Sequence, residues 1–80
     1  MNIYYWMAST QAALTAATMV LSGGQFVPID PNYRVGSGTS GTWYATLTST
    51  TVLTPPAGVT DISNDPVNLP LAKQVVGVWA

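Results

Sequence analysis

The sequence lacks three residue types that carry much of protein chemistry, because it contains no cysteine, no histidine and no glutamate. Without cysteine, disulfide bonds and thiolate metal sites are excluded. Without histidine, the commonest general base and metal ligand is also missing. A chain of 80 residues buries only roughly 60% of its unfolded surface and is marginally stable alone. Small chains otherwise rely on disulfides, metals or oligomers, so we expect this one to be stabilised by assembly with other chains.

Charge is equally scarce. Charged residues make up 6% of the chain, against about 25% in an average soluble domain. They are Asp30, Arg34, Asp61, Asp65 and Lys73, and the net charge is −1. Two cations neutralise few phosphates, which argues against a nucleic-acid partner. A surface with so few charges is poorly protected against self-association, so we expect other protein molecules to cover part of it.

Long hydrophobic runs are absent as well. No run approaches the roughly 18 apolar residues of a spanning helix, so we expect no membrane span. The first 22 residues lack the positively charged start of a secretory signal, and polar residues interrupt their apolar stretch. We therefore expect no cleaved signal peptide.

The pattern of apolar and polar residues predicts a single α+β domain over residues 1–80, with one N-terminal helix packed on a small antiparallel sheet and with extended arms or loops. Residues 9–22 are rich in alanine and uncharged, and they predict that helix. We expect Ser9 or Thr10 at its N-cap and the Gly23–Gly24 pair at its C-terminal end.

Polar side chains on the predicted helix form one narrow stripe. The stripe comprises Gln11, Thr15, Thr18 and Ser22, at spacings that follow one helical face. Nearly every other side chain on the helix is small and apolar. We therefore expect the helix to be buried on most sides, which is difficult for so short a chain to achieve alone.

The remaining chain predicts strands and one long loop. Residues 2–7 are bulky and aromatic, and they predict either a strand that covers the core or an arm that reaches a neighbouring subunit. Strands are also expected within residues 25–54 and over residues 71–79, with the clearest alternation after position 42. Residues 55–70 hold four of the six prolines and predict an extended loop with little regular structure, within which a short strand around Val59 to Ile62 is an option. A loop of that length usually has a function or a partner.

Two short motifs suggest chemistry but fit a structural interpretation better. Gly36-x-Gly38-x-x-Gly41 has the spacing of a dinucleotide-binding loop, yet a strand rather than a helix is expected to follow it, so a flexible loop is favoured. Asp61-x-Ser63-x-Asp65 resembles the start of a calcium loop, but the later ligands are missing, so turn-forming aspartates are favoured. No histidine is present to activate a serine nucleophile. We expect no enzyme, no cofactor and no metal site.

Aromatic residues are the best candidates for binding. In a chain with so little charge, aromatic side chains fit the anchors of a protein interface. A rival interpretation uses Trp43 and Tyr44 as a stacking platform for carbohydrate. We predict an interface that combines aromatic anchors with a small-residue seam on the helix. The anchors are Tyr4, Tyr5, Trp6 and Trp79, and the seam is Ala12, Ala13, Ala16 and Val20.

The uncharged alanine helix from Ala12 to Leu21, the threonine-rich segment from Thr42 to Thr54 and the apolar C-terminal segment give the chain a familiar composition. The chain resembles small virion structural proteins of tailed bacteriophages, of the capsid decoration, cement or tail adaptor type. This resemblance implies a many-copy subunit of a virion that stabilises contacts between neighbouring proteins, including copies of itself. Two alternatives remain open: a carbohydrate-binding or adhesion module displayed on a cell surface, and a small membrane-associated or pilus-associated subunit.

Overall fold

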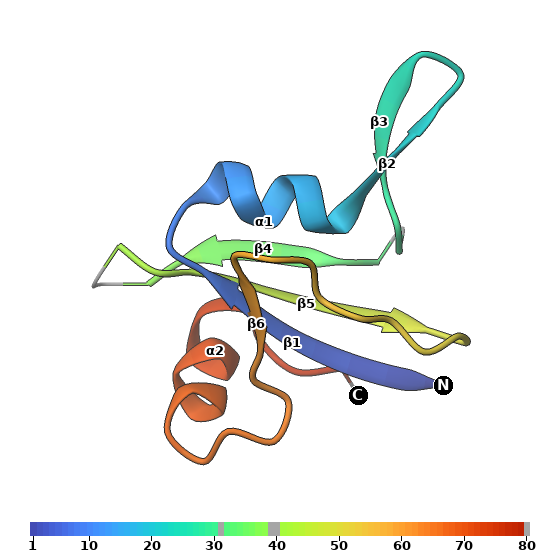
Figure 1. Ribbon diagram of the computed structural model, residues 1–80. Helices are drawn as coiled ribbons and strands as arrows, with labels where there is room; N and C mark the ends of the chain where they lie inside the picture. The colour runs from blue at the N-terminus through green and yellow to red at the C-terminus, as the bar shows by residue number, and fades with distance from the viewer. Residues whose placement is uncertain (31, 39–40, 80) are drawn as a thin grey trace.

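The computed structural model describes residues 1–30, 32–38 and 41–79. Within these residues the fold is α+β, as expected, with two helices and six strands. The elements in chain order are β1 (Asn2–Ala8), α1 (Gln11–Thr18), β2 (Met19–Ser22), β3 (Gln25–Pro28), β4 (Arg34–Ser37), β5 (Trp43–Ser49), β6 (Val59–Asp61) and α2 (Asn68–Val76). An antiparallel sheet in the order β4-β5-β1-β6 lies between the two helices, and β2 and β3 form a separate hairpin that projects beyond the end of α1 (Figure 1).

Strand β1 lies inside the sheet and is the centre of the fold. It pairs with β5 along its whole length, from Asn2 opposite Ser49 to Ala8 opposite Trp43, and its second half also pairs with β6. The aromatic run therefore belongs to a core strand and is not an arm on a neighbouring subunit. Because successive side chains of a strand point to opposite faces, Tyr5 and Trp6 enter two different cores.

Each face of the sheet carries its own core. On the α1 face, Trp6, Ala8, Ala45 and Leu47 pack with Leu14 and Ala17 of the helix. On the α2 face, Tyr5, Tyr44 and Ile62 pack with Ala72 and Val76. Each helix therefore covers one face of the sheet with one of its own faces.

The predicted helix over residues 9–22 is shorter than expected. Its N-cap is Thr10, one of the two residues predicted for that position. The Thr10 hydroxyl accepts a hydrogen bond from the amide of Ala13. The helix ends at Thr18, and the chain continues as strand β2. The predicted polar stripe was also wrong in part, because Thr18 is buried and its hydroxyl donates to the carbonyl of Leu14.

The Gly23–Gly24 pair forms a hairpin turn and not a helix cap. Its φ angles of 59° and 84° fit a type I′ turn, which requires a positive φ at both central residues and matches the twist of the flanking strands. Residues 19–22 pair with residues 25–28 across this turn. Pairing with β3 thus replaces the last turn of the predicted helix.

The expectation of a closing strand over residues 71–79 was wrong, because most of that segment belongs to helix α2. Leu69, Ala72 and Val76 lie three and four residues apart and pack on the sheet. The carboxylate of Asp65 accepts hydrogen bonds from the amides of Val67 and Asn68 at the start of the helix. Pro70 lies in the first turn of the helix. At this position an N–H group has no helical carbonyl to bond, so the missing N–H of proline costs no helical hydrogen bond.

The Pro-rich segment 55–70 contains the short strand expected around Val59 to Ile62, as β6, but its last three residues belong to the first turn of α2, which was not expected. The glycine motif lies between β4 and β5, and its positions 39 and 40 fall outside the described residues. A Cβ atom on Gly36 would lie 2.6 Å from a methyl group of Val75. This glycine therefore lets α2 pack closely against β4, which is a structural role.

Trp6 provides a direct test of this core, since its side chain is 1% exposed. We predict that Trp6→Ala lowers the free energy of unfolding by about 3–5 kcal/mol, because it removes a large buried side chain and leaves a cavity. Urea denaturation followed by circular dichroism measures the change. Val52→Ala is the control, since Val52 is 84% exposed, and a Trp6 variant as stable as this control would contradict the assignment.

Candidate functional site

The predicted interface residues fall into two groups. The aromatic residues of β1 are used inside the chain: Trp6 and Tyr5 are buried in opposite cores, and half-buried Tyr4 packs at 6.1 Å from the Trp6 ring. The hydroxyl of Tyr4 accepts a hydrogen bond from the amide of Leu53. These three rings therefore leave little surface for a partner.

Trp79 is docked on its own chain. Its ring lies 4.0 Å from the guanidinium carbon of Arg34, a cation–π contact. The same guanidinium donates hydrogen bonds to the carbonyls of Val76 and Val78. Arg34 thus fixes the segment after α2 against β4.

The helix seam is divided by the packing of α1. Ala13 is half-buried against the core, whereas Ala12 and Ala16 are exposed on the outer face of the helix. Val20 lies in the hairpin and is also exposed. The structure therefore brings Ala12 and Ala16 together on one outward surface, with Val20 on the hairpin beyond it.

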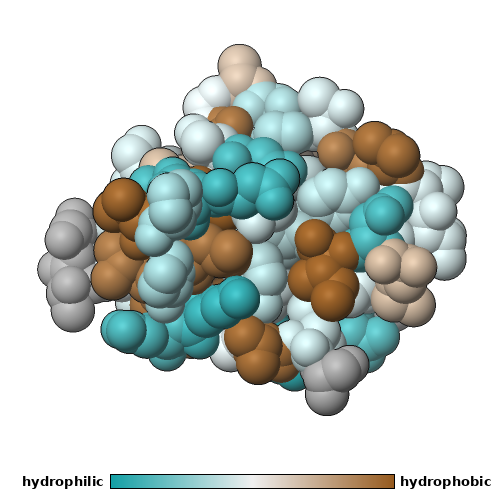
Figure 2. All heavy atoms as spheres, turned by 90° about the horizontal axis from the view of Figure 1, so that it is seen from below, coloured by the Kyte–Doolittle hydropathy of each residue, from teal (hydrophilic) through white to brown (hydrophobic). Residues whose placement is uncertain are grey.

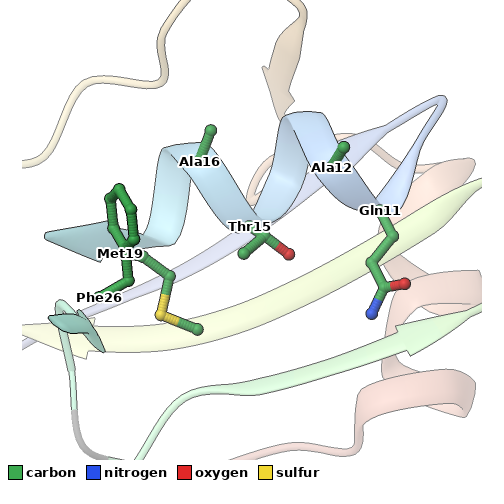
Figure 3. Close-up of a pocket in the computed structure, with 6 residues that line it drawn as sticks. All are labelled: Gln11, Ala12, Thr15, Ala16, Met19 and Phe26. Carbon is green, nitrogen blue, oxygen red and sulfur yellow. The ribbon is translucent and has the colours of Figure 1, made fainter.

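An open apolar groove runs along this outer face. Its volume is about 480 Å³, and Figure 3 shows Phe26 and Met19 at the hairpin end and Gln11 at the other. The lining residues are Gln11, Ala12, Thr15, Ala16, Met19 and Phe26. None of them is ionisable, and their polar groups are confined to one amide and one hydroxyl. We call the groove, together with Val20 and Leu21, the docking surface.

The hairpin exposes large apolar side chains, and one of them, Phe26, also lines the groove. Leu21 is 65% exposed and Phe26, directly opposite it, is 73% exposed. Val20 is exposed on the other face of the hairpin. A two-stranded sheet is marginally stable in water by itself, so a projecting hairpin with apolar side chains on both faces is a candidate for contact with another molecule.

The opposite side of the molecule has a different character. Figure 2, which views the side on which α2 lies, shows apolar side chains in separate patches with polar side chains between them. Exposed apolar residues of this region include Val67, Leu71 and Val78. Such scattered residues are ordinary on protein surfaces, so the docking surface is the better candidate site.

Two hydrogen-bonded groups hold the base of the hairpin. The amide of Ile29 donates to the carbonyl of Thr18, at 2.8 Å. The buried carboxylate of Asp30 accepts hydrogen bonds from both the hydroxyl and the amide of Thr48 in β5, and from the amide of Asn32. These contacts fix the hairpin to the end of the sheet and so set its direction.

The environment of Asp30 shifts its acidity. Burial by itself would raise the pKa, but the hydrogen bonds from the Thr48 hydroxyl, the Asn32 amide and the Thr48 amide outweigh it. The pKa of Asp30 is therefore lowered from its ordinary value of 3.8. The ionised carboxylate is the form that holds the hairpin base.

The carbohydrate platform does not form. Tyr44 is buried in the α2-side core, whereas Trp43 packs against the α1-side core, so the two rings lie on opposite faces of the sheet. Adjacent residues of a strand cannot share a face.

The paired aspartates act in turns. Asp61 accepts a hydrogen bond from the amide of Ser63. The pKa of Asp65 is lowered by hydrogen bonds from the amide of Asn68, then from its side chain and from the amide of Val67. Within residues 1–30, 32–38 and 41–79, no three acidic, histidine or cysteine side chains cluster as metal ligands would.

Sequence reasoning did not identify Met19, Leu21 and Phe26 as surface residues of the site. The available signal was Gly-Gly between two short apolar runs, which is typical of a hairpin. No helix within the described residues is long and apolar enough to cross a membrane. Comparisons with known proteins returned no match to any family model, curated protein or solved structure.

We predict that acid weakens the fold through Asp30. The pKa of Asp30 is lower in the folded chain than in the unfolded chain, so near this pKa the unfolded chain binds more protons than the folded chain. The free energy of unfolding therefore decreases as the pH falls below about 4. Asp30→Asn should be less stable at pH 7 and should lose less stability on acidification. Urea denaturation at a series of pH values measures both, and an unchanged pH dependence in the variant would argue against this role.

Proposed function

We propose that the chain is a non-enzymatic structural subunit of a large protein assembly, and that the docking surface is where it contacts its neighbours. The observation that carries this proposal is the projecting hairpin, whose Leu21 and Phe26 are 65% and 73% exposed beside an apolar groove. Large apolar side chains on a projecting element are stabilised when a partner covers them, at about 25 cal/mol per Å² of apolar area before other costs.

The chemistry of the docking surface fits permanent contact better than transient binding. A surface without ionisable groups loses no charge hydration when it is covered, and the neutral amide of Gln11 and hydroxyl of Thr15 can form hydrogen bonds at its edge. The small side chains of Ala12 and Ala16 allow a partner's backbone to approach the helix closely. These properties suit a subunit that remains assembled.

A virion of a tailed bacteriophage is the setting that we favour, in agreement with the resemblance of composition. In such a particle many copies act together, so modest contacts between neighbours add to a stable whole. The role of the chain would be to reinforce contacts between adjacent proteins of the capsid or tail.

This function is tested by fractionating an extract of the native source by size. We expect the chain in complexes many times larger than its own mass of 8.4 kDa. Phe26→Ser should shift a large part of the chain to small fractions, because it removes the most exposed aromatic side chain of the docking surface.

The matched control for this experiment is Val67→Ser. Val67 is 69% exposed and is the N-cap residue of α2, the helix that covers the other face of the sheet (Figure 1). This variant should fractionate like the unmodified chain. If the unmodified chain itself elutes at 8.4 kDa in the native extract, the structural-subunit function is wrong.

A further inference from the structure

The hydrogen-bond pattern of the hairpin identifies which of its backbone groups point outward. Bonded and non-bonded residue pairs alternate along an antiparallel ladder. The amide of Ile29 donates to the carbonyl of Thr18, so this pair is bonded. The next bonded pair is therefore Val20 with Val27, two residues along the register. It follows that Leu21 turns its N–H and C=O to the outer edge of β2.

The two outer edges of the hairpin differ in their ability to pair. On β3, the outward positions are Phe26 and Pro28, and proline has no N–H to donate. On β2, the outward positions are Met19 and Leu21, and the strand contains neither proline nor charge. The main sheet is better protected, since its edge strands carry Arg34 in β4 and Asp61 in β6. Among the described strands, β2 offers the least protected edge.

We propose that the β2 edge pairs with the β2 edge of a second copy of this chain, antiparallel and about a two-fold axis. Val20 lies on the axis, opposite Val20 of the other copy. The Leu21 N–H of each copy donates to the Met19 carbonyl of the other. The hairpins then join into one four-stranded sheet in the order β3-β2-β2-β3. This inference rests on the proposed function and names a second copy as the first neighbour.

The side chains of the hairpin support a self-complementary contact. Met19, Leu21 and Phe26 lie on the face toward the groove, so the joined sheet collects six such side chains over the outer faces of two α1 helices. A two-fold contact places each group close to its own equivalent, which opposes association where charges are present. The docking surface has none, and the net charge of −1 adds little repulsion.

A stable dimer sets a minimum area for this contact. A stable interface buries roughly 800 Å² on each partner, and one chain exposes 4796 Å² in total. About one sixth of the surface is therefore needed. Four residues of strand are too few by themselves, so the groove and Phe26 must be covered in the same contact.

Charged substitutions at Val20 test this arrangement in the purified chain. We expect sedimentation equilibrium to give twice the 8.4 kDa mass for the unmodified chain. Val20→Lys and Val20→Glu should each be monomeric, because like charges then lie directly opposite across the axis. An equimolar mixture of the two variants should return to the dimer mass. Val52→Lys, at an exposed position in the loop after β5, should stay dimeric.

The possible results separate the two proposals. Circular dichroism should show both Val20 variants folded, since this side chain is 47% exposed. The two-fold contact is overturned if the unmodified chain is monomeric, if either Val20 variant stays dimeric, or if the mixture stays monomeric. In any of these cases a large complex in the native extract would still support the structural-subunit function, with a different protein as the neighbour.

Discussion

The fold depends on one constraint, namely that the central strand is apolar on both faces. Tyr5 and Trp6 point in opposite directions from β1, so each face of the sheet needs its own cover. The chain meets this need with one helix on each side. Both helices are short, and each packs on the sheet with only one of its faces. Within the part of the chain that the structure describes, no other element covers the outer face of α1 or the hairpin that follows it.

The hairpin is shaped by the same shortage of chain. It leaves the end of α1 directly, and the Gly23–Gly24 turn returns it after only four residues per strand. Its base is fixed by Asp30 and by the bond between Ile29 and Thr18, whereas its tip exposes Leu21 and Phe26. Because its base is anchored, the hairpin holds its apolar tip in a fixed direction. Less conformational entropy is then lost when a partner binds the tip.

Sequence reasoning recovered the parts of the fold that local patterns determine. The alternation around Trp43 predicted β5. For the aromatic run, a strand that covers the core was one of two predictions, beside an arm on a neighbouring subunit. The failures lie where two local signals compete. Gly23–Gly24 suits a helix end as well as a hairpin turn, and only the pairing of residues 19–22 with residues 25–28 decides between them. Val75 and Val76 favour a strand by propensity, yet the spacing from Leu69 to Val76 and the hydrogen bonds that the Asp65 carboxylate accepts at the start of α2 favour a helix.

The candidate site was predicted only in part, because the sequence shows how few charges there are but not where they lie. In the structure most of the five charged residues support local geometry. Asp30 holds the hairpin base, and Arg34 holds the C-terminal segment. Asp65 accepts hydrogen bonds at the start of α2, and Asp61 accepts one in a turn. Lys73 lies 5.9 Å from the centre of the Tyr5 ring. None lines the groove. Association through this surface therefore gains nothing from electrostatic steering, and its strength must come from shape, apolar burial and backbone pairing.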